Sequence, residues 1–415
     1  MISFMKKKDY FEKGILEGLY LCIAKVIYRL VVRCYVLYNQ RFGKLNENHI
    51  VFASTPDFSD NSRALSDYLI NNGYQKKYKI FWVVYDAKKY SKEDTSSEIV
   101  FLEKKNKFGA YSLSSLKIIL KAGTLLGTHD IVWIKGRSIK GQKYIRLWHG
   151  CSYKDRASND GVAPRSFDFA LVSGPLFVDI KAYFWNVDKK YIHPLGYPRY
   201  DWLLREEKRA LEFKKRLCIN NEQLIIWMPT FRNDIQGRFN SIEGISSFPL
   251  MSDDNSWKEL DQMCKKLNVR IVVKTHVFQK EYKIPWDSFS NINRLTNDDL
   301  CEEGIKLYEF LAVTDALISD YSSVAIDYLI VNKPIAFALD DYKLYKDKRG
   351  FVLENPLDYM PGHHLYNLND MSVFLHDVVS KNDSYAEKRA ELRNNAVTIS
   401  SHYCKDVADA IGLVR

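Results

Sequence analysis

Two adjacent serines, Ser322 and Ser323, mark the point in the segment ISDYSSVAIDYLIVNKPI where an apolar run gives way to apolar residues at helical spacing. The first turn of a helix carries backbone N–H groups without partners and a partial positive charge, so it can bind an anion. Small serine side chains allow close approach and add hydroxyl donors. The pattern predicts a phosphate site at this turn, but serines there also serve simply as helix caps.

Three more residues of the same segment are candidates for this site. Asp320 and Tyr321 stand where the strand-like run ends, and Asp327 follows about one helical turn after the serines. For Asp327 the alternative role is an orienting hydrogen bond within the wall of the site.

Polar and basic residues also follow two other strand-like runs. Pro229, Thr230 and Arg232 come from the motif MPTFRND, and Lys274 and His276 come from KTHVF. Neither G-x-G-x-x-G nor G-x-x-x-x-G-K-[ST] occurs, so phosphate binding must come from helix ends and basic side chains. Alone, Arg232 and Lys274 would be ordinary surface charges. At one edge of a sheet they would form a cage for a pyrophosphate.

A proton acceptor is suggested by His149, which ends a strand-like run in RLWHGCSYKD. An imidazole titrates near neutral pH and can take a proton from an attacking hydroxyl. A single histidine more often has a structural role, and His129 in GTHD competes for the same function. Hydrolase triads are poorly supported because no G-x-S-x-G occurs.

A scaffold for these residues is indicated by short β-rich runs that alternate with longer helical patterns. This alternation predicts an α/β fold with parallel sheets, in two Rossmann-like halves joined near residue 215. In an open parallel sheet the ligand binds beyond the carboxyl ends of the strands, where most of these candidates stand. The expected strands lie within 49–54, 79–86, 97–103, 123–128, 144–150 and 167–174, and within 224–230, 269–276, 291–296, 315–320 and 334–339.

The length of 415 residues is enough for two ordinary domains, and a hydrophobic content of 46% supports packed cores. The expected organisation is a basic amphipathic helix in 1–44, Rossmann-like domains in 45–215 and 216–384, and a helix in 385–415 that packs back across the domains.

The net charge of +10 is concentrated near the N-terminus, where residues 1–43 hold eight Lys and Arg residues and three acidic ones. Lys25, Arg29 and Arg33 recur every four positions and share one helical face opposite apolar residues. A spanning helix needs about 20 nearly uncharged residues. The pattern therefore predicts an amphipathic helix lying on an anionic membrane surface. The alternative is a helix that packs its apolar face on its own domain.

The cysteines, the N-terminal stretch and the placement of basic residues argue against a zinc site, a cleavable signal and a nucleic-acid partner. Seven scattered cysteines form no C-x-x-C pair and no zinc-site spacing, which is typical of a reducing, cytoplasmic setting without a protein-bound metal. No cleavable signal sequence is expected, because the N-terminal apolar stretch carries charges. Nucleic acid is a weaker partner, since the basic residues gather on one helix instead of interleaving with exposed aromatics.

The motifs LWHG, GYPRYDWLL, MPTFR, KTH and SDYSSVAIDYLIVNKPI, followed by RGF, occur in this order between about residues 50 and 361. Together they resemble the CDP-glycerol glycerophosphotransferases that build teichoic acids and related capsular polymers. The resemblance implies a glycosyltransferase-B-like arrangement, with the acceptor domain first and the CDP-donor-binding domain second. It also implies a peripheral enzyme at the cytoplasmic face of the membrane. Such an enzyme would transfer an alditol phosphate to a lipid-linked saccharide or polyol-phosphate acceptor and release CMP, without a cofactor.

Roles for individual residues follow from the matching motifs. The resemblance implies His149 as general base, and His276 with Arg232 as donors to the pyrophosphate. It implies that Ser322 and Ser323 bind a phosphate of the donor, which agrees with the phosphate site predicted at this turn.

Gly150 and Arg199 belong to the motifs LWHG and GYPRYDWLL, and the resemblance leaves them on the acceptor side or in a structural role. The chain departs from the family pattern at Val277, where a proline usually follows KTH, and at Cys151 and Tyr200, where threonine and asparagine are common. The departures leave the reaction class unchanged, and leave open the identities of the donor and the acceptor. CDP-glycerol is the expected donor, and CDP-ribitol or another CDP-alditol is the alternative.

Two other functions remain open. A glycosyltransferase of the same architecture would move a sugar from a nucleotide sugar. A membrane-associated binding protein would keep the fold without catalysis, although the intact histidines argue against it.

Overall fold

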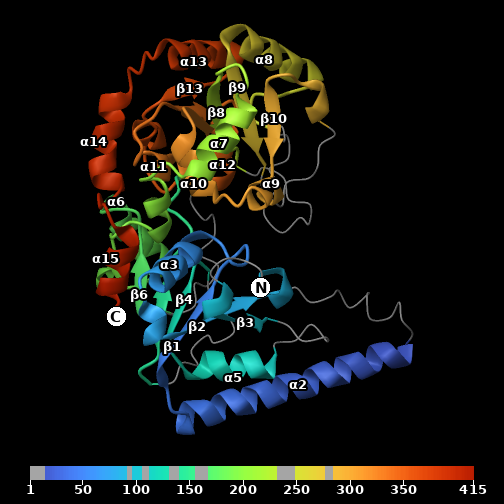
Figure 1. The fold of residues 1–415 in the computed structure, drawn as a ribbon, viewed down its shortest axis with the longest axis vertical. Coiled ribbons are helices and arrows are strands. Elements are labelled where there is room, and N and C mark those ends of the chain that lie inside the picture. Colours follow the sequence, from blue (N-terminus) through green and yellow to red (C-terminus); the bar gives the residue numbers. More distant parts are fainter. Residues whose placement is uncertain are drawn as a thin grey trace. The chain divides into compact units, whose positions relative to one another are not determined.

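The computed structural model describes residues 15–90, 96–104, 112–129, 140–154, 167–230, 248–275 and 284–415, and side chains at these positions except 15–25, 29, 96 and 349. The chain divides into two compact units (Figure 1). The first takes its described residues from Met1–His149, Ala163–Leu171 and Cys404–Arg415, and the second from Gly150–Val162 and Val172–Tyr403.

The first unit is a parallel sheet with helices, and its strands run in the order β3-β2-β1-β4-β5-β6. Residues 50–52 of the central strand β1 are fully buried whichever face they point to, as expected for a parallel strand that is covered on both sides. Its elements are α2 (Ile15–Phe42), β1 (Asn46–Ala53), α3 (Asp60–Asn71), β2 (Lys79–Val84), α4 (Ala87–Tyr90), β3 (Ile99–Glu103), α5 (Leu113–Lys121), β4 (Ala122–Gly127), β5 (Lys143–Arg146) and β6 (Phe169–Leu171).

The second unit is built on another parallel sheet, with the strand order β10-β9-β8-β11-β12-β13. Ile225 and Trp227 of β8 pack with residues of α8 and α13, while Leu224 and Ile226, which point to the opposite face, are also fully buried. The strands of this sheet are β8 (Gln223–Trp227), β9 (Val269–Lys274), β10 (Ile292–Leu295), β11 (Ala316–Ser319), β12 (Ile335–Ala338) and β13 (His363–Leu365). The two-residue strand β7 (Ile192–His193) also falls in this unit but is not part of this sheet.

Most helices of this unit precede one of its strands in the chain, and α13 and α14 follow the last strand. The helices are α6 (Leu176–Trp185), α7 (Lys208–Leu217), α8 (Asp254–Leu267), α9 (Asn297–Glu302), α10 (Leu307–Val313), α11 (Val324–Tyr328), α12 (Tyr342–Arg349), α13 (Leu368–Ser380) and α14 (Ala386–Ala396). A 3₁₀ helix (Pro198–Trp202) precedes α7, and α15 (Tyr403–Ala410) begins at the last residue of this unit and continues in the first.

The two parallel sheets confirm the predicted α/β fold, and each of the eleven predicted runs contains a strand. The predicted boundary near residue 215 lies inside the second unit. The reason is that α7 is attached there by Lys214, whose Nζ donates to Asp315 Oδ1 at 2.7 Å. In the predicted C-terminal segment, α14 groups with the second unit and Cys404–Arg415 with the first.

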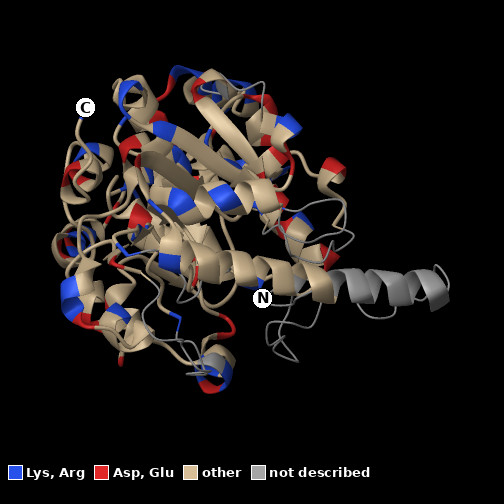
Figure 2. Ribbon diagram, turned by 90° about the horizontal axis from the view of Figure 1, so that it is seen from below, with Lys and Arg blue, Asp and Glu red and all other residues tan. Residues whose placement is uncertain are grey.

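Helix α2 has both a packed face and an exposed face. Val36 is buried against Leu116 and Leu120 of α5, with Val32 and Tyr35 beside it. On another face Ile27 and Leu30 are 56% and 57% exposed, together with Val26, Val31, Leu37 and Tyr38. The described part of this helix is largely uncharged in Figure 2. Among the described residues, no helix has the length and apolarity that crossing a bilayer requires.

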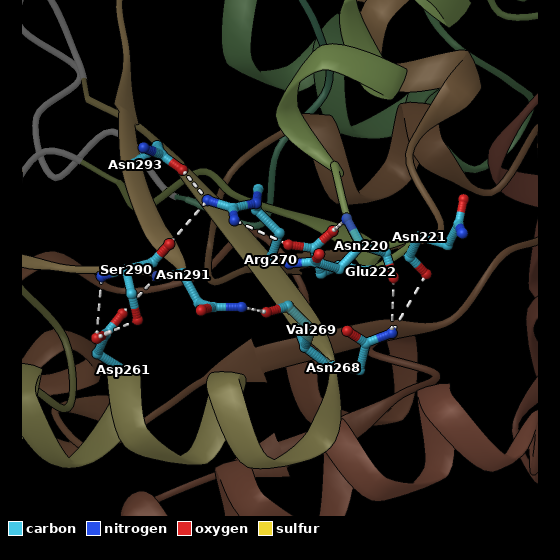
Figure 3. A network of polar contacts seen from close by, with 10 residues as sticks. All are labelled: Asn220, Asn221, Glu222, Asp261, Asn268, Val269, Arg270, Ser290, Asn291 and Asn293. Carbon is cyan, nitrogen blue, oxygen red and sulfur yellow. Dashed lines mark hydrogen bonds and ion pairs between the residues drawn. The ribbon is translucent and has the colours of Figure 1, made fainter.

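A polar network joins the amino ends of β8, β9 and β10 (Figure 3). Arg270 donates through Nη2 to Glu222 Oε1 at 2.8 Å and through Nη1 to Asn293 Oδ1 at 2.7 Å. Burial raises the pKa of Glu222, but hydrogen bonds from Arg270 and from backbone amides outweigh it and hold the pKa below its usual range. These contacts tie the strands together at the edge opposite to the predicted site.

Candidate functional site

The strand ends of the first unit bring His149 next to Thr128. β1, β4 and β5 are neighbours in the sheet, and pairing continues just beyond them through Leu147 N to Gly127 O at 2.8 Å and Thr128 N to Ala53 O at 3.3 Å. The residues that follow β4 and β5 therefore share the carboxyl edge, as the sequence predicted.

The imidazole of His149 is half-buried and oriented by its surroundings. Its Nδ1 lies 3.4 Å from the carbonyl oxygen of Thr128, and its ring is stacked on that of His129. A carbonyl can only accept, so this contact favours the tautomer in which Nδ1 carries the proton. Nε2 then keeps its lone pair and is able to accept a proton from a substrate hydroxyl.

The backbone before His149 has an unusual conformation. Trp148 has a φ of 55°, in the left-handed region that bulky residues rarely occupy. Asn61, at the start of α3, is fully buried and donates through Nδ2 to the carbonyls of Trp148 at 2.8 Å and Leu147 at 3.3 Å. These bonds stabilise the turn that presents His149.

In the second unit, the carboxyl end of β11 is tied to the end of β8. Asp320 is fully buried, and its carboxylate accepts hydrogen bonds from Thr230 N at 2.6 Å and from the Thr230 hydroxyl. Pro229 and Thr230 are buried as well. The bonds between Asp320 and Thr230 hold the two strand ends together.

The turn between β11 and α11 presents amides that the fold does not use. Among the residues that the structure describes, no acceptor receives a hydrogen bond from the N–H of Ser322, Ser323 or Val324, and neither serine hydroxyl has a partner. Ser323 occupies the N-cap position, yet its side chain makes no capping bond. The turn therefore offers hydrogen-bond donors to an anion. The serine side chains do not cap the helix in this structure.

Gly150 lies against this turn within the second unit. It has a φ of +127°, and a Cβ at this position would meet Ser323 Oγ at 2.5 Å and Arg199 Nη2 at 3.1 Å. Only glycine fits both the backbone conformation and the space. The glycine of the LWHG motif therefore lets the chain after His149 approach the serine turn and the Arg199 guanidinium.

Asp327 is held by three side chains rather than directed at a ligand. Its fully buried carboxylate accepts hydrogen bonds from Arg199 Nη2 at 2.6 Å, from Tyr308 Oη at 2.5 Å and from the Tyr200 hydroxyl. Burial and the nearby Asp327 carboxylate raise the pKa of Tyr200 well above its usual value, so this phenol stays protonated and donates. Of the two roles considered, the geometry favours the orienting one.

Tyr321 and Lys274 differ in what they can offer a ligand. The Tyr321 ring is fully buried and its hydroxyl donates to Asp341 Oδ1 at 2.8 Å, so it braces the turn. Lys274 ends β9, and burial lowers the pKa of its amine to about 8. A bound anion would stabilise the charged form of this buried amine, so Lys274 is suited to bind a phosphate.

Several candidate residues lie where the structure gives no description. Arg232 and His276 are outside the described residues, as are the side chains of Lys25 and Arg29 on α2. Arg33 is exposed.

Sequence reasoning missed the residues that orient the site. Asn61, Thr128 and Tyr308 carry no motif, and their roles depend on contacts between distant segments. Among the described side chains, no cluster of three or more His, Cys, Asp or Glu residues could hold a metal ion.

The chain matches known proteins over most of its length. The model of the family described as CDP-Glycerol:Poly(glycerophosphate) glycerophosphotransferase matches residues 35–403. A teichoic acid poly(glycerol phosphate) polymerase of Bacillus spizizenii is 26% identical over 357 residues, which cover 78% of this chain and 83% of that protein.

Other relatives match in part, and solved structures share the fold. A teichoic acid ribitol-phosphate primase of Bacillus spizizenii is 26% identical over 58% of this chain and 61% of its own length. The wall teichoic acid polymerase TagF has a TM-score of 0.72 at 19% identity, over 97% of each chain. A TagF variant soaked with CDPG has a TM-score of 0.71 at 19% identity, over 95% of this chain and 96% of that one.

Proposed function

Because this chain belongs to the CDP-glycerol:poly(glycerophosphate) glycerophosphotransferase family, whose members transfer phosphate-containing groups, we propose that it transfers glycerol phosphate from CDP-glycerol to an acceptor hydroxyl and releases CMP. The acceptor is a lipid-linked saccharide or a polyol-phosphate chain, in teichoic acid or capsular polymer synthesis. CDP-ribitol is the second candidate donor, because ribitol-phosphate primases and polymerases are among the relatives.

The observation that carries the proposal is the serine turn of the second unit. Unused amides at 322–324 and the hydroxyls of Ser322 and Ser323 lie together at one turn, where a glycine, Gly150, leaves room beside Ser323. Successive free N–H groups with nearby hydroxyl donors are a favourable environment for a phosphate. Lys274, Arg232 and His276 are the further proposed donors to the pyrophosphate.

In the proposed mechanism His149 is the general base. Nε2 takes the proton of the acceptor hydroxyl, the acceptor oxygen bonds to the β-phosphorus, and the bond from that phosphorus to the bridging oxygen of CMP breaks. His149 is the residue before Gly150, and Gly150 lies against Ser323. Positioning and positive charge supply most of the catalysis in such a reaction.

A nucleotide-sugar glycosyltransferase is the rival enzyme, and a donor screen separates the two. Purified protein is incubated with acceptor and with CDP-glycerol, CDP-ribitol or nucleotide sugars, and the released nucleotide is identified. We expect CMP from a CDP-alditol, since phosphorus moves to the acceptor. Release of a nucleoside diphosphate from a nucleotide sugar, without CMP from any CDP-alditol, would refute the proposal.

The serine turn gives a prediction about donor binding. Ser322→Ala with Ser323→Ala should reduce the thermal stabilisation that CDP-glycerol produces, because two hydroxyl donors to the phosphate are lost while the amides remain. The free double variant should melt close to wild type, since neither hydroxyl is hydrogen-bonded to any described residue. Thermal shift across a donor titration measures both effects. An unchanged ligand-induced shift would mean that the hydroxyls do not bind the donor.

We also propose that α2 holds the enzyme at the cytoplasmic surface of an anionic membrane, where a lipid-linked acceptor is accessible. Packing on α5 uses the face with Val36, and leaves Ile27 and Leu30 exposed on another. Helix α2 can therefore both pack on α5 and contact a membrane, because the two contacts use different faces of the helix. An exposed apolar stripe with basic residues along the same helix is suited to a bilayer interface.

Reversing the basic stripe should release the protein from anionic vesicles. Lys25→Glu, Arg29→Glu, Arg33→Glu should weaken binding by about 100-fold, since each basic residue near an anionic surface contributes about 1 kcal/mol. Cosedimentation with phosphatidylserine-containing liposomes at low and high salt measures it.

The matched control reverses three exposed lysines of α8, Lys258, Lys265 and Lys266, and makes the same change in net charge. It should keep most of the vesicle binding. Equal losses in both triple variants would mean that net charge, not α2, attracts the protein to the membrane.

A further inference from the structure

The ring of His149 needs a constraint that its backbone does not supply. Asn61 fixes the carbonyls of Leu147 and Trp148, and therefore the position of the main chain. Rotation about the bonds of the side chain would still move Nε2 by several ångströms. A general base that is displaced by about 1 Å can lose about a hundredfold in rate, so ring orientation matters as much as backbone position.

His129 lies where it can supply this constraint. Its ring is parallel to that of His149, with an interplanar angle of 5° and centroids 4.3 Å apart. The Trp148 ring also lies against that of His149, with centroids 4.1 Å apart and a tilt of 37°. A stacked aromatic face resists rotation of the ring that it packs on.

His129 is itself oriented by the fully buried Thr128. Thr128 Oγ1 lies 3.1 Å from His129 Nδ1, and the Thr128 carbonyl lies 3.4 Å from His149 Nδ1. One residue at the end of β4 thus contacts both imidazoles, His129 through its hydroxyl and His149 through its carbonyl at the longer distance.

We infer that His129 is a positioning residue that holds the imidazole of His149 in its reactive orientation by stacking, an inference that rests on the proposed role of His149 as general base. His129 acts through the face of its ring and exchanges no proton with the substrate. It should affect the chemical step and leave donor affinity nearly unchanged.

The test compares two replacements that differ in stacking. His129→Ala removes the ring and should lower kcat by about 10- to 100-fold, with KM for CDP-glycerol within about twofold of wild type. His129→Phe keeps an aromatic face without a titratable nitrogen, and should recover kcat to within about fivefold of wild type. His402→Ala, at an exposed histidine, is the control and should leave kcat unchanged.

The outcomes separate this inference from the proposed function. If His129→Ala keeps wild-type kcat while His149→Ala is inactive, only the inference is wrong. If His129→Phe is folded by circular dichroism but as inactive as His149→Ala, His129 itself transfers the proton and the inference is overturned. If His149→Ala keeps activity, the assignment of the base fails whatever the His129 variants do.

Discussion

Replacing His149 with alanine is expected to lower the rate of transfer by about 10²- to 10⁴-fold, the usual contribution of a general base. The reason is that Nε2 would accept the proton of the attacking hydroxyl in the transition state, while Nδ1 faces the carbonyl of Thr128. Donor affinity should stay close to wild type, because a base contributes little to binding in the ground state. Steady-state kinetics of CMP release measures the rate, and calorimetry measures the affinity.

His193 provides a matched control for this variant. It is also a half-buried histidine, but it is the last residue of β7, a strand that contributes no candidate residue. His193→Ala should therefore leave the rate of transfer within a few-fold of wild type. Activity of His149→Ala within the same range would remove His149 from the role of base.

The second large effect is expected at the buried carboxylate of Asp327. Asp327→Ala should destabilise the second unit by about 3–5 kcal/mol, because it leaves the buried guanidinium of Arg199 without its counter-charge. The two tyrosine hydroxyls that donate to this carboxylate also lose their acceptor. The thermal midpoint should fall by roughly 10 °C, as followed by circular dichroism.

A double variant distinguishes an unpaired charge from a simple loss of contacts. Asp327→Leu with Arg199→Leu should be more stable than Asp327→Leu alone, because no unpaired buried charge remains. Asp409→Ala, which breaks an exposed pair with Lys405, is the control and should leave the midpoint within error of wild type. Equal midpoints for the single and double Leu variants would contradict this account.

The strands could be predicted because strands of a parallel sheet are buried on both faces and form continuous apolar runs. Residues 50–52 and 224–227 illustrate this, since all are fully buried. β13 was missed because its three residues, His363–Leu365, begin with two histidines and give no apolar run. Near the predicted boundary at residue 215, the contact of Lys214 in α7 with Asp315 could not be predicted, because these residues are 101 positions apart in the chain.

Part of the site could be predicted, because some of its residues stand at a recognisable local pattern in the sequence. Ser322 and Ser323 stand at a change from strand to helix, which is a local signal. For Asp327 the sequence left two roles open, because its partners Arg199 and Tyr200 are more than a hundred residues away in the chain. Thr128 contacts His149 through its backbone carbonyl, which any residue possesses, so its type gives no signal of that contact.

The composition of the first unit from three separate stretches has a consequence for biosynthesis. Its last stretch, Cys404–Arg415, buries Val407 and Leu413, and Arg415 Nη2 donates to Asn72 Oδ1 at 3.0 Å. A ribosome makes about 5–20 residues per second. The strands of the first unit are therefore synthesised well before Cys404–Arg415, and this unit cannot be completed until the second unit has been translated. The part of the first unit that contains His149 therefore emerges from the ribosome before that unit is complete. A chain that ends before residue 404 would lack part of the first unit, although the missing residues are at its C-terminus.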